Sequence, residues 1–204
     1  MKTGDIIAHN AAAEIHPYNL TQKIPAPQNR TLTLTETEQH HYCSRLLRVE
    51  SPMSVQAILN QTICQDVFEV LENLPENFVD LLFVDPPYNL TKAFNQRLVR
   101  RRTMAEYTDW VDRWLSQLVR ILKPTASIYL CGDWRSSNAL YLMAEKYFVV
   151  RNRITWEREK GRGAKANWKN CAEDIWFCTV SQNYYFNAQA VQLKRQVRAP
   201  YTDA

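Results

Sequence analysis

An apolar run that ends in two consecutive prolines constrains this chain more than any other feature. Residues 79–84 (VDLLFV) have the length and composition of a buried β-strand, and Asp85-Pro86-Pro87-Tyr88 follows them directly. Because proline has no backbone N–H to donate to a neighbouring strand, a central strand must end before Pro86. Ligands of open α/β sheets bind at the carboxyl ends of strands, so this turn is a candidate binding site.

The turn carries the groups that would suit a planar base with an exocyclic amine. Asp85 and the carbonyl of Pro86 can accept hydrogen bonds from an NH2 group, and Tyr88 can stack on the ring. The missing N–H of proline leaves only acceptors facing the amine. The alternative is an ordinary loop, in which Asp85 caps the next element and Tyr88 is a core residue.

Strand and helix signals alternate around this turn. Three segments have strand composition, at residues 62–64, 79–84 and 127–131. Helix signals occur at residues 66–74, at 103–121, which open on a Thr-x-x-Glu capping box, and at 138–147. Lys123-Pro124 is expected to end the second helix, and residues 148–156 and 174–179 to pair antiparallel across a long basic loop. This order predicts an α/β fold with a parallel sheet and an antiparallel edge.

The other stretches have weaker signals. Residues 1–35 contain three prolines and many polar residues, which predicts an extended or partly ordered arm. Helices are expected at 35–47, with Thr35 or Thr37 as the cap, and at 54–59. Residues 89–102 are polar and basic without a periodic apolar face, so they are predicted to be a mobile loop beside the turn.

The residues around the turn resemble a known family. Residues 63–90 read ICQDVFEVLENLPENFVDLLFVDPPYNL, residues 114–130 read WLSQLVRILKPTASIYL, and residues 154–179 read ITWEREKGRGAKANWKNCAEDIWFCT. Together they resemble the S-adenosylmethionine-dependent amino-methyltransferases of DNA, whose signature is Asp/Asn/Ser-Pro-Pro-Tyr/Phe. The order of the segments is similar to that of the permuted group, in which the catalytic half precedes the cofactor half.

The resemblance implies a Rossmann-like methyltransferase sheet and methyl transfer from S-adenosylmethionine to a base flipped out of double-stranded DNA. It assigns catalysis to Asp85, Pro86, Pro87 and Tyr88, with Asp85 also at the cofactor. Adenine N6 is favoured over cytosine N4, because the resembling adenine enzymes usually carry Asp at the first position and the cytosine enzymes more often carry Ser. An exocyclic amine needs no cysteine nucleophile, which argues against carbon-5 cytosine methylation.

Asp66 has two explanations. With Glu69 it has the spacing of a capping box at the start of a helix. The resemblance adds a second role, because the family places an acidic residue at this strand end in contact with the adenine moiety of the cofactor. The cofactor role is favoured over the cap alone.

The chain departs from the family in its glycines. The family's cofactor half carries a Phe-x-Gly-x-Gly turn and a Pro-Thr-x-Lys-Pro segment, and neither occurs here. The chain has only four glycines: Gly4, Gly132, Gly161 and Gly163. The Gly-x-Gly at residue 161 has no strand before it and is not a nucleotide-binding turn. The expected sheet is therefore incomplete, without the glycine-rich cofactor-binding half.

Basic residues occur in clusters although the net charge is only +4. Clustered Lys and Arg are typical of phosphate binding, although any single cluster is more often a solvated loop. The residues expected to bind DNA are Arg97, Arg100, Arg101, Arg102, Arg162, Lys165, Trp168 and Lys169. Trp168 could equally anchor its loop.

The cysteine pattern and the apolar runs of the sequence indicate the expected cellular compartment. The five cysteines have no Cys-x-x-Cys spacing, so they are expected to be reduced and buried in a cytoplasmic protein, and no metal site is expected. No apolar run is long enough to span a membrane.

Three regions are expected: residues 1–60 as an arm with short helices, 61–182 as the catalytic portion, and 183–204 as a tail or the start of a target-recognition region. The competing hypothesis is an inactive or split-enzyme DNA-binding fragment. Its cofactor half would come from a second chain, or a homodimer would complete the pocket. A methyltransferase acting on RNA or on protein glutamine is a weaker alternative.

Overall fold

The computed structural model describes residues 34–94, 97–162, 166 and 168–191. The chain divides into two compact units, Met1–Arg45 and Leu46–Ala204. The described part of the first unit contains helix α1 (Glu36–Cys43). Thr35 caps this helix in a capping box with Glu38, as one of the two predicted caps requires. The expected boundaries at residues 60/61 and 182/183 stay predictions.

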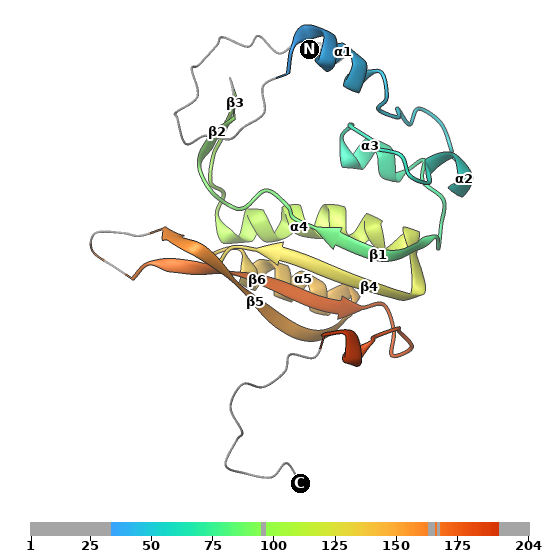
Figure 1. The fold of residues 1–204 in the computed structure, drawn as a ribbon. Helices are drawn as coiled ribbons and strands as arrows, with labels where there is room; N and C mark the ends of the chain where they lie inside the picture. Colours follow the sequence, from blue (N-terminus) through green and yellow to red (C-terminus); the bar gives the residue numbers. More distant parts are fainter. Residues whose placement is uncertain (1–33, 95–96, 163–165, 167, 192–204) are drawn as a thin grey trace, which may run out of the picture. The chain divides into compact units, whose positions relative to one another are not determined.

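The second unit is built on a four-stranded mixed sheet in the order β1-β4-β6-β5 (Figure 1). The strands are β1 (Val79–Val84), β4 (Leu122–Gly132), β5 (Val149–Arg162) and β6 (Asn170–Thr179). β1 and β4 are parallel, whereas β6 pairs antiparallel with both β4 and β5. The sheet is therefore more antiparallel than the sequence predicts, since the parallel part of the described sheet is a single pair.

The strand predicted at residues 62–64 is not present as a strand. Ile63 makes one isolated parallel bridge with Leu47. The chain around it instead forms two short helices, α2 (Val55–Ile58) and α3 (Val67–Leu71). A single bridge satisfies few backbone groups, so this segment does not extend the sheet, and β1 remains at the edge of the described sheet.

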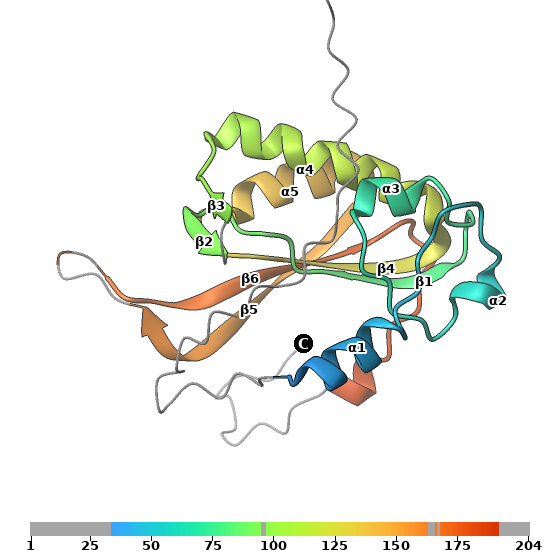
Figure 2. The same ribbon diagram turned by 90° about the horizontal axis from the view of Figure 1, so that it is seen from above.

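Two amphipathic helices cover one face of the sheet, α4 (Met104–Leu118) and α5 (Ser137–Tyr147) (Figure 2). The predicted capping box of Thr103 and Glu106 opens α4. Buried side chains of both helices meet those of β4 in one core, formed by Val111, Trp114, Leu115, Ile128, Leu130 and Leu140. This packing fixes where β1 and β4 end, and so where the Asp-Pro-Pro-Tyr turn lies.

The other face of the sheet is apolar but less covered at β1. Leu81 is 59% exposed and Phe83 is 57% exposed. Phe83 stacks on Tyr129, and Tyr129 stacks on Phe177. Residues 184–186, which lead into the 3-10 helix η2 (Ala188–Val191), pack onto Phe177 and not onto Leu81. The described residues thus leave the β1 end of this face open.

The junction between α4 and β4 differs from the prediction. A 3-10 turn, η1 (Val119–Ile121), follows α4, and β4 begins at Leu122, so Lys123 and Pro124 lie within the strand. The register between β1 and β4 jumps from Val79↔Leu122 to Leu81↔Ser127. Pro124 lies in the skipped stretch, where no ladder hydrogen bond to β1 requires its missing N–H.

Two predicted loops are hairpins. Residues 89–102 contain β2 (Lys92–Phe94) and β3 (Arg97–Val99), which pair antiparallel. The long basic loop expected after residue 156 is mostly strand, because β5 continues to Arg162 and β6 begins at Asn170. Both hairpins extend from the end of the sheet at which β1 and β4 terminate (Figures 1 and 2).

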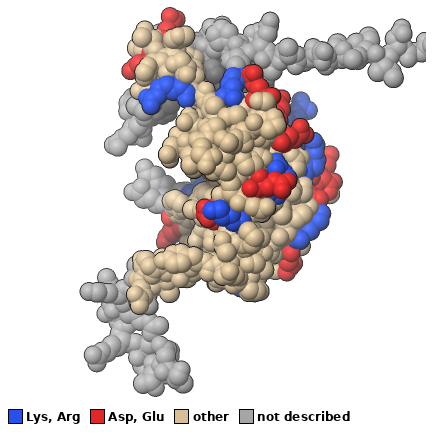
Figure 3. All heavy atoms as spheres, turned by 90° about the vertical axis from the view of Figure 1, so that its right-hand side faces the viewer, with Lys and Arg blue, Asp and Glu red and all other residues tan. Residues whose placement is uncertain are grey.

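Acidic and basic side chains are interspersed on the face shown in Figure 3, and no large patch of one sign covers it. Several of the described charges are paired. Lys123 binds Asp80, Lys146 binds Asp112, and Arg120 lies 3.7 Å from Glu76. Exposed pairs of this kind are each worth roughly 0–1 kcal/mol, so they shape the surface potential more than the stability.

Candidate active site

The Asp-Pro-Pro-Tyr turn leaves β1 with its residues alternately exposed and covered. Asp85 and Pro87 are exposed, Pro86 is buried and Tyr88 is half-buried. The hydroxyl of Tyr107 in α4 donates to the Pro87 carbonyl at 3.1 Å. Burial raises the pKa of Tyr107 to about 12, so its hydroxyl remains a donor at neutral pH. The helix that covers the sheet therefore also anchors the turn.

The carbonyl of the buried Pro86 and the carboxylate of the exposed Asp85 are the two acceptors that the turn was predicted to offer an amine. Among the described residues, no hydrogen bond reaches the Pro86 carbonyl and no ion pair engages Asp85. Proline contributes no N–H here, so the turn presents acceptors only. This arrangement agrees with the prediction that the turn could receive an amine.

Tyr88 is held by a partner that the sequence did not reveal. Its hydroxyl donates to Glu173 Oε2 at 2.9 Å, across from the turn on β6. Glu173 Oε1 in turn lies 3.2 Å from Arg158 Nη1 on β5. Burial raises the pKa of Tyr88, and the hydrogen bond to Glu173 and the charges of Glu173 and Asp85 raise it further. Tyr88 is thus a neutral phenol with a fixed hydroxyl, not a simple core residue.

Asn89 closes the β2–β3 hairpin at its base. It is only 4% exposed. Its Nδ2 donates to the Arg102 carbonyl at 3.0 Å, and its Oδ1 accepts from the Arg102 N–H at 2.8 Å. Its own N–H donates to Ser136 Oγ at 3.2 Å. Asn89 therefore joins the turn, the hairpin and the start of α5, a structural role that agrees with assigning it no chemistry.

Cys131 lies beside the turn but is not activated. Val84 pairs with Leu130 in the parallel ladder, which brings the next residues, Asp85 after β1 and Cys131 within β4, to the same end of the sheet. Burial raises the pKa of the Cys131 thiol to about 11, and the negative charges of Asp85 and Glu173 add to this effect. A thiol that stays protonated at neutral pH is a poor nucleophile. The site is consistent with chemistry that forms no covalent cysteine intermediate.

Asp66 is a helix cap in this structure. Its Oδ1 accepts from the Phe68 N–H at 2.9 Å at the start of α3. The structure records this Asp66 bond and not the return bond from Glu69 that a full capping box would have. The side chain is exposed, so the cap leaves the cofactor role assigned to Asp66 as a prediction.

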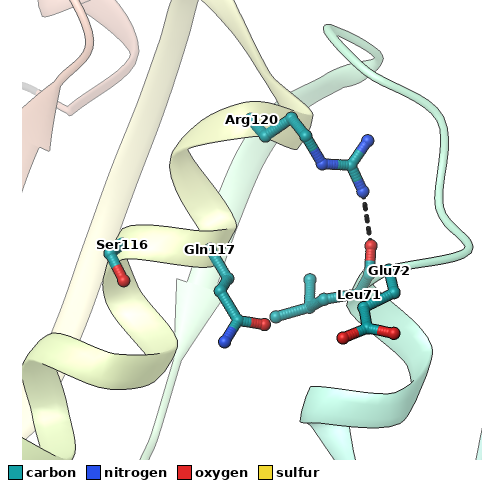
Figure 4. Close-up of a pocket in the computed structure, with 5 residues that line it drawn as sticks. All are labelled: Leu71, Glu72, Ser116, Gln117 and Arg120. Carbon is teal, nitrogen blue, oxygen red and sulfur yellow. Dashed lines mark hydrogen bonds between the residues drawn. The ribbon is translucent and has the colours of Figure 1, made fainter.

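Two surface pockets lie among the described residues, and neither contains Asp66 or Asp85. The first, of about 330 Å³, is lined by Leu71, Glu72, Ser116, Gln117 and Arg120. Figure 4 shows the Arg120 guanidinium donating to the Leu71 carbonyl across it, which ties α3 to the helical layer. The second, of about 340 Å³, is lined by Arg102, Glu106, Asp109, Trp110 and Arg113.

The residues expected to bind DNA occupy the two hairpins. Arg100, Arg101 and Arg102 are exposed and directly follow β3, which contains Arg97. Trp168 is 96% exposed and Lys169, also exposed, directly precedes β6. Arg162 is the last residue of β5, and Lys165 lies outside the described residues. Arg102 also places its guanidinium 5.3 Å from the Trp110 ring centroid, within the range of a cation–π contact.

The cysteine prediction is partly wrong. Cys131 and Cys178 are buried as expected, whereas Cys43 and Cys64 are exposed and Cys171 is half-buried. All five are free. Within the described ranges, no helix is both long and apolar enough to cross a membrane, and no group of three His, Cys, Asp or Glu side chains could hold a metal ion.

The structure has a mixed α/β sheet with the Asp-Pro-Pro-Tyr turn at the end of β1, and comparison with known proteins gives its class. The family model described as DNA methylase matches residues 79–200, more than half of the 204-residue chain. The chain therefore belongs to the DNA methylase family. S-adenosylmethionine is the cofactor that membership of this family indicates.

Among curated relatives, the chain is 30% identical over 128 residues to the DNA adenine methyltransferase YhdJ of Escherichia coli K12, covering 62% of this chain and 43% of the relative. It is 28% identical over 148 residues to the type II methyltransferase M.BglII of Bacillus subtilis, covering 68% of this chain and 40% of that relative. The chain thus spans less than half the length of these relatives.

Among solved structures, the PvuII DNA methyltransferase (cytosine-N4-specific) matches with a TM-score of 0.50 and 16% identity, over 63% of this chain and 52% of that one. This match shows a shared fold.

The described residues fit the cofactor only in part. The carboxylates of Asp66 and Asp85 can accept from an amine, but neither of the two pockets described above encloses them. The expectation that no strand precedes the Gly-x-Gly is wrong, because β5 continues to Arg162 and contains Gly161. The next element is strand β6 and not a helix, so this Gly-x-Gly lacks the strand-turn-helix context of a nucleotide-binding turn.

Proposed function

We propose that this chain acts in the site-specific methylation of DNA, on the exocyclic amine of a flipped base, with adenine N6 as the favoured target. The observation that carries this proposal is the Asp85-Pro86-Pro87-Tyr88 turn at the end of β1 in a member of the DNA methylase family. The turn contains the exposed carboxylate of Asp85, the carbonyl of Pro86 and the aromatic ring of Tyr88. Pro87, which follows that carbonyl, has no backbone N–H.

The target base must leave the duplex to reach this turn, because stacking and pairing hide its amine. Extrusion costs roughly a few kcal/mol. Tyr88 offsets part of this cost by stacking on the ring, a contact worth about 1–3 kcal/mol per base in other nucleic-acid sites. The β2–β3 hairpin and its basic residues flank the turn and can contact the displaced backbone.

The acceptors of the turn prepare the amine for reaction. Its nitrogen is a poor nucleophile because its lone pair is delocalised into the ring. Hydrogen bonds to Asp85 and to the Pro86 carbonyl favour a pyramidal nitrogen whose lone pair is free to attack. The Pro87 carbonyl is already engaged by Tyr107, which fixes the orientation of the turn. Positioning and electrostatics thus make the main contributions.

When bound, S-adenosylmethionine supplies an electrophilic methyl group for direct transfer. Asp85 faces the amine and can accept the proton that the nitrogen loses. We also propose that the free part of the Asp66 carboxylate contacts the adenine moiety of the cofactor, because Asp66 is exposed beyond its capping bond.

The preference for adenine rests on Asp85. The first residue of the turn is Asp, as in the resembling adenine enzymes, and one relative is a DNA adenine methyltransferase. The DNA contacts are proposed at Arg97, Arg100, Arg101, Arg102, Arg162, Lys165, Trp168 and Lys169. Double-stranded DNA is the proposed partner.

Replacing Asp85 tests the proposal. Asp85→Ala is expected to lower methylation by about 10²-fold or more, because an acceptor at the reacting amine is lost, while DNA affinity stays close to that of the wild type. Asp80→Ala is the matched control, since Asp80 lies on the same strand, is exposed and pairs only with Lys123 in the described residues. Unchanged methylation by Asp85→Ala would overturn the mechanism.

A second candidate function is a DNA-binding fragment that needs a second polypeptide, or a second copy of itself, to bind cofactor. The open β1 end of the sheet, with Leu81 and Phe83 exposed, favours it. Calorimetric titration with S-adenosylmethionine separates the two. Binding at about one site per chain supports a cofactor site in this chain or its dimer, and no binding supports the partner-dependent fragment.

A further inference from the structure

Three side chains from three strands or strand ends meet beside the catalytic turn. Tyr88 follows β1, Glu173 lies in β6 and Arg158 lies in β5. The Tyr88 hydroxyl donates to Glu173 Oε2 at 2.9 Å, and Glu173 Oε1 pairs with Arg158 Nη1 at 3.2 Å. Glu173 thus uses one carboxylate oxygen for the phenol and the other for the guanidinium.

The geometry points to Glu173 as a positioning residue: we propose that it fixes the Tyr88 ring for stacking on the target base, and that Arg158 holds Glu173 in place. The inference rests on the proposed function, because it assumes that Tyr88 receives a base. It adds two residues to the site, Glu173 on β6 and Arg158 on β5, and neither belongs to the Asp-Pro-Pro-Tyr turn.

Stacking alone does not require this hydrogen bond. A phenylalanine, which the resembling signature also allows at this position, can stack but cannot donate. A hydroxyl bond restrains rotation of the ring about its side-chain torsions without covering the ring faces. Restraining the ring before the base arrives lowers the entropy lost on stacking. The bond to Glu173 therefore serves orientation.

The pair is sufficiently enclosed to hold its geometry. The side chains of Arg158 and Glu173 are 28% and 27% exposed, whereas each other ion pair among the described residues has a partner that is more than half exposed. Arg158 Nη2 also lies 3.4 Å from the Asn170 carbonyl, near the start of β6. The guanidinium pairs with Oε1 of Glu173 and leaves Oε2 as the acceptor for the phenol.

This network also joins the turn to the β5–β6 hairpin. Glu173 and Arg158 lie on its two strands, and Lys169 and the exposed Trp168 lie directly before β6. The element proposed to contact DNA is therefore the same element that orients the stacking ring.

A double-mutant cycle tests the contact without relying on methylation. The variants are Tyr88→Phe, Glu173→Ala and both together, with the thermal midpoint as the readout. A shared contact predicts that the double variant is no less stable than the less stable single variant. Strictly additive shifts would overturn the proposal, because they would mean that the two side chains do not interact.

Methylation kinetics then separate positioning from a purely structural role. Glu173→Ala is expected to lower kcat by about 10- to 100-fold with little change in KM for DNA, because the ring is misplaced. Glu173→Gln keeps an oxygen acceptor and is expected to recover most of that loss. Glu157→Gln, on the same hairpin and exposed, is the matched control and is expected to match the wild type.

The outcomes are distinguishable. A wild-type kcat for a folded Glu173→Ala overturns the positioning role while the proposed function stands. A wild-type chain that binds cofactor and DNA but methylates nothing overturns the proposed function, and with it the catalytic meaning of the contact, even if the thermal cycle is non-additive. An active wild type with a non-additive cycle and rescue by Glu173→Gln supports both.

Discussion

At the scale of single residues, Asn89 links three parts of the site with its backbone and its amide. The amide donates to the Arg102 carbonyl and accepts from the Arg102 N–H, so both of its ends are matched. A carboxylate in its place could accept but not donate, and it would face the Arg102 carbonyl. Buried groups without a partner are costly, which makes this residue sensitive to the smallest change of side chain.

Asn89→Asp is therefore expected to lower the free energy of unfolding by about 1–3 kcal/mol. Asn138→Asp is the matched control, because Asn138 is exposed in the first turn of α5 and should change stability little. Denaturant unfolding followed by circular dichroism measures both. Equal midpoints for the two variants would contradict the closing role of Asn89.

Cysteine reactivity is a second consequence at this scale. Burial raises the pKa of Cys131 to about 11 and that of Cys178 to about 12. The thiolate is the reactive form, so both thiols should resist alkylation at pH 7–8, whereas exposed Cys43 and Cys64 should react. Peptide mass spectrometry after brief treatment with a maleimide measures this. Labelling of Cys131 as fast as of Cys64 in the folded protein would contradict it.

The same raised pKa values predict the direction in which stability changes at high pH. Between pH 9, the ordinary value of a thiol, and pH 11, the folded state keeps a proton on Cys131 that the unfolded state releases. Stability should therefore fall as pH rises through this window. Cys131→Ala removes this thiol, so the stability lost between pH 9 and pH 11 should be smaller in this variant than in the wild type.

The turn could be found from the sequence because its signal is local. Two prolines after an apolar run mark a strand end without any knowledge of distant residues. The partners of the turn give no such signal. Glu173 is 85 positions from Tyr88, and Ser136 is 47 positions from Asn89. They meet the turn only because the fold places β4 between β1 and β6 and packs α5 behind the sheet, which no local pattern states.

At the scale of elements, the helical layer supports the site from behind. Tyr107 in α4 holds the Pro87 carbonyl, and Ser136 at the start of α5 holds Asn89. The two helices are joined by Asp112, which accepts from Lys146 Nζ at 2.8 Å and from the Tyr147 hydroxyl. Loosening this junction would move both supports of the turn.

These hydrogen bonds, first from Lys146 and then from Tyr147, lower the pKa of Asp112 below its ordinary value of 3.8. The ionised form is stabilised in the fold, so its contribution is present above pH 3.8 and is lost as pH falls below that value. Asp112→Asn should thus lower the thermal midpoint at pH 7, and the difference from the wild type should shrink in acid. Asp109→Asn, an exposed neighbour in α4, is the control. A difference that grows in acid would contradict this account.

Capped helices were predicted closely, whereas several strands were missed. Thr103 begins a helix through the predicted capping box, and Thr35 is one of the two caps predicted for the first helix. Strands β2 and β3 are only three residues long, and the extensions of β5 and β6 consist mainly of polar residues. These strands are held by pairing with each other, and such pairing depends on the partner strand and not on the segment's own sequence.

At the scale of the whole molecule, family membership shows the class of chemistry but leaves the target open. The family model covers both N6 and N4 methylation, and the chain spans less than half the length of the first relatives. The open β1 end of the sheet concerns whether this chain binds the cofactor by itself. The Asp-Pro-Pro-Tyr turn concerns the methyl transfer, so identifying the methylated product is the most direct test of the role proposed for the turn.

Identification of the methylated nucleoside tests the central claim. The purified chain is incubated with unmethylated DNA and isotope-labelled S-adenosylmethionine, and the digested DNA is analysed by mass spectrometry of its nucleosides, with Asp85→Ala in parallel. The account predicts labelled N6-methyladenine from the wild type and only traces from Asp85→Ala. Label on carbon-5 of cytosine, or equal label from the wild type and Asp85→Ala, would contradict it.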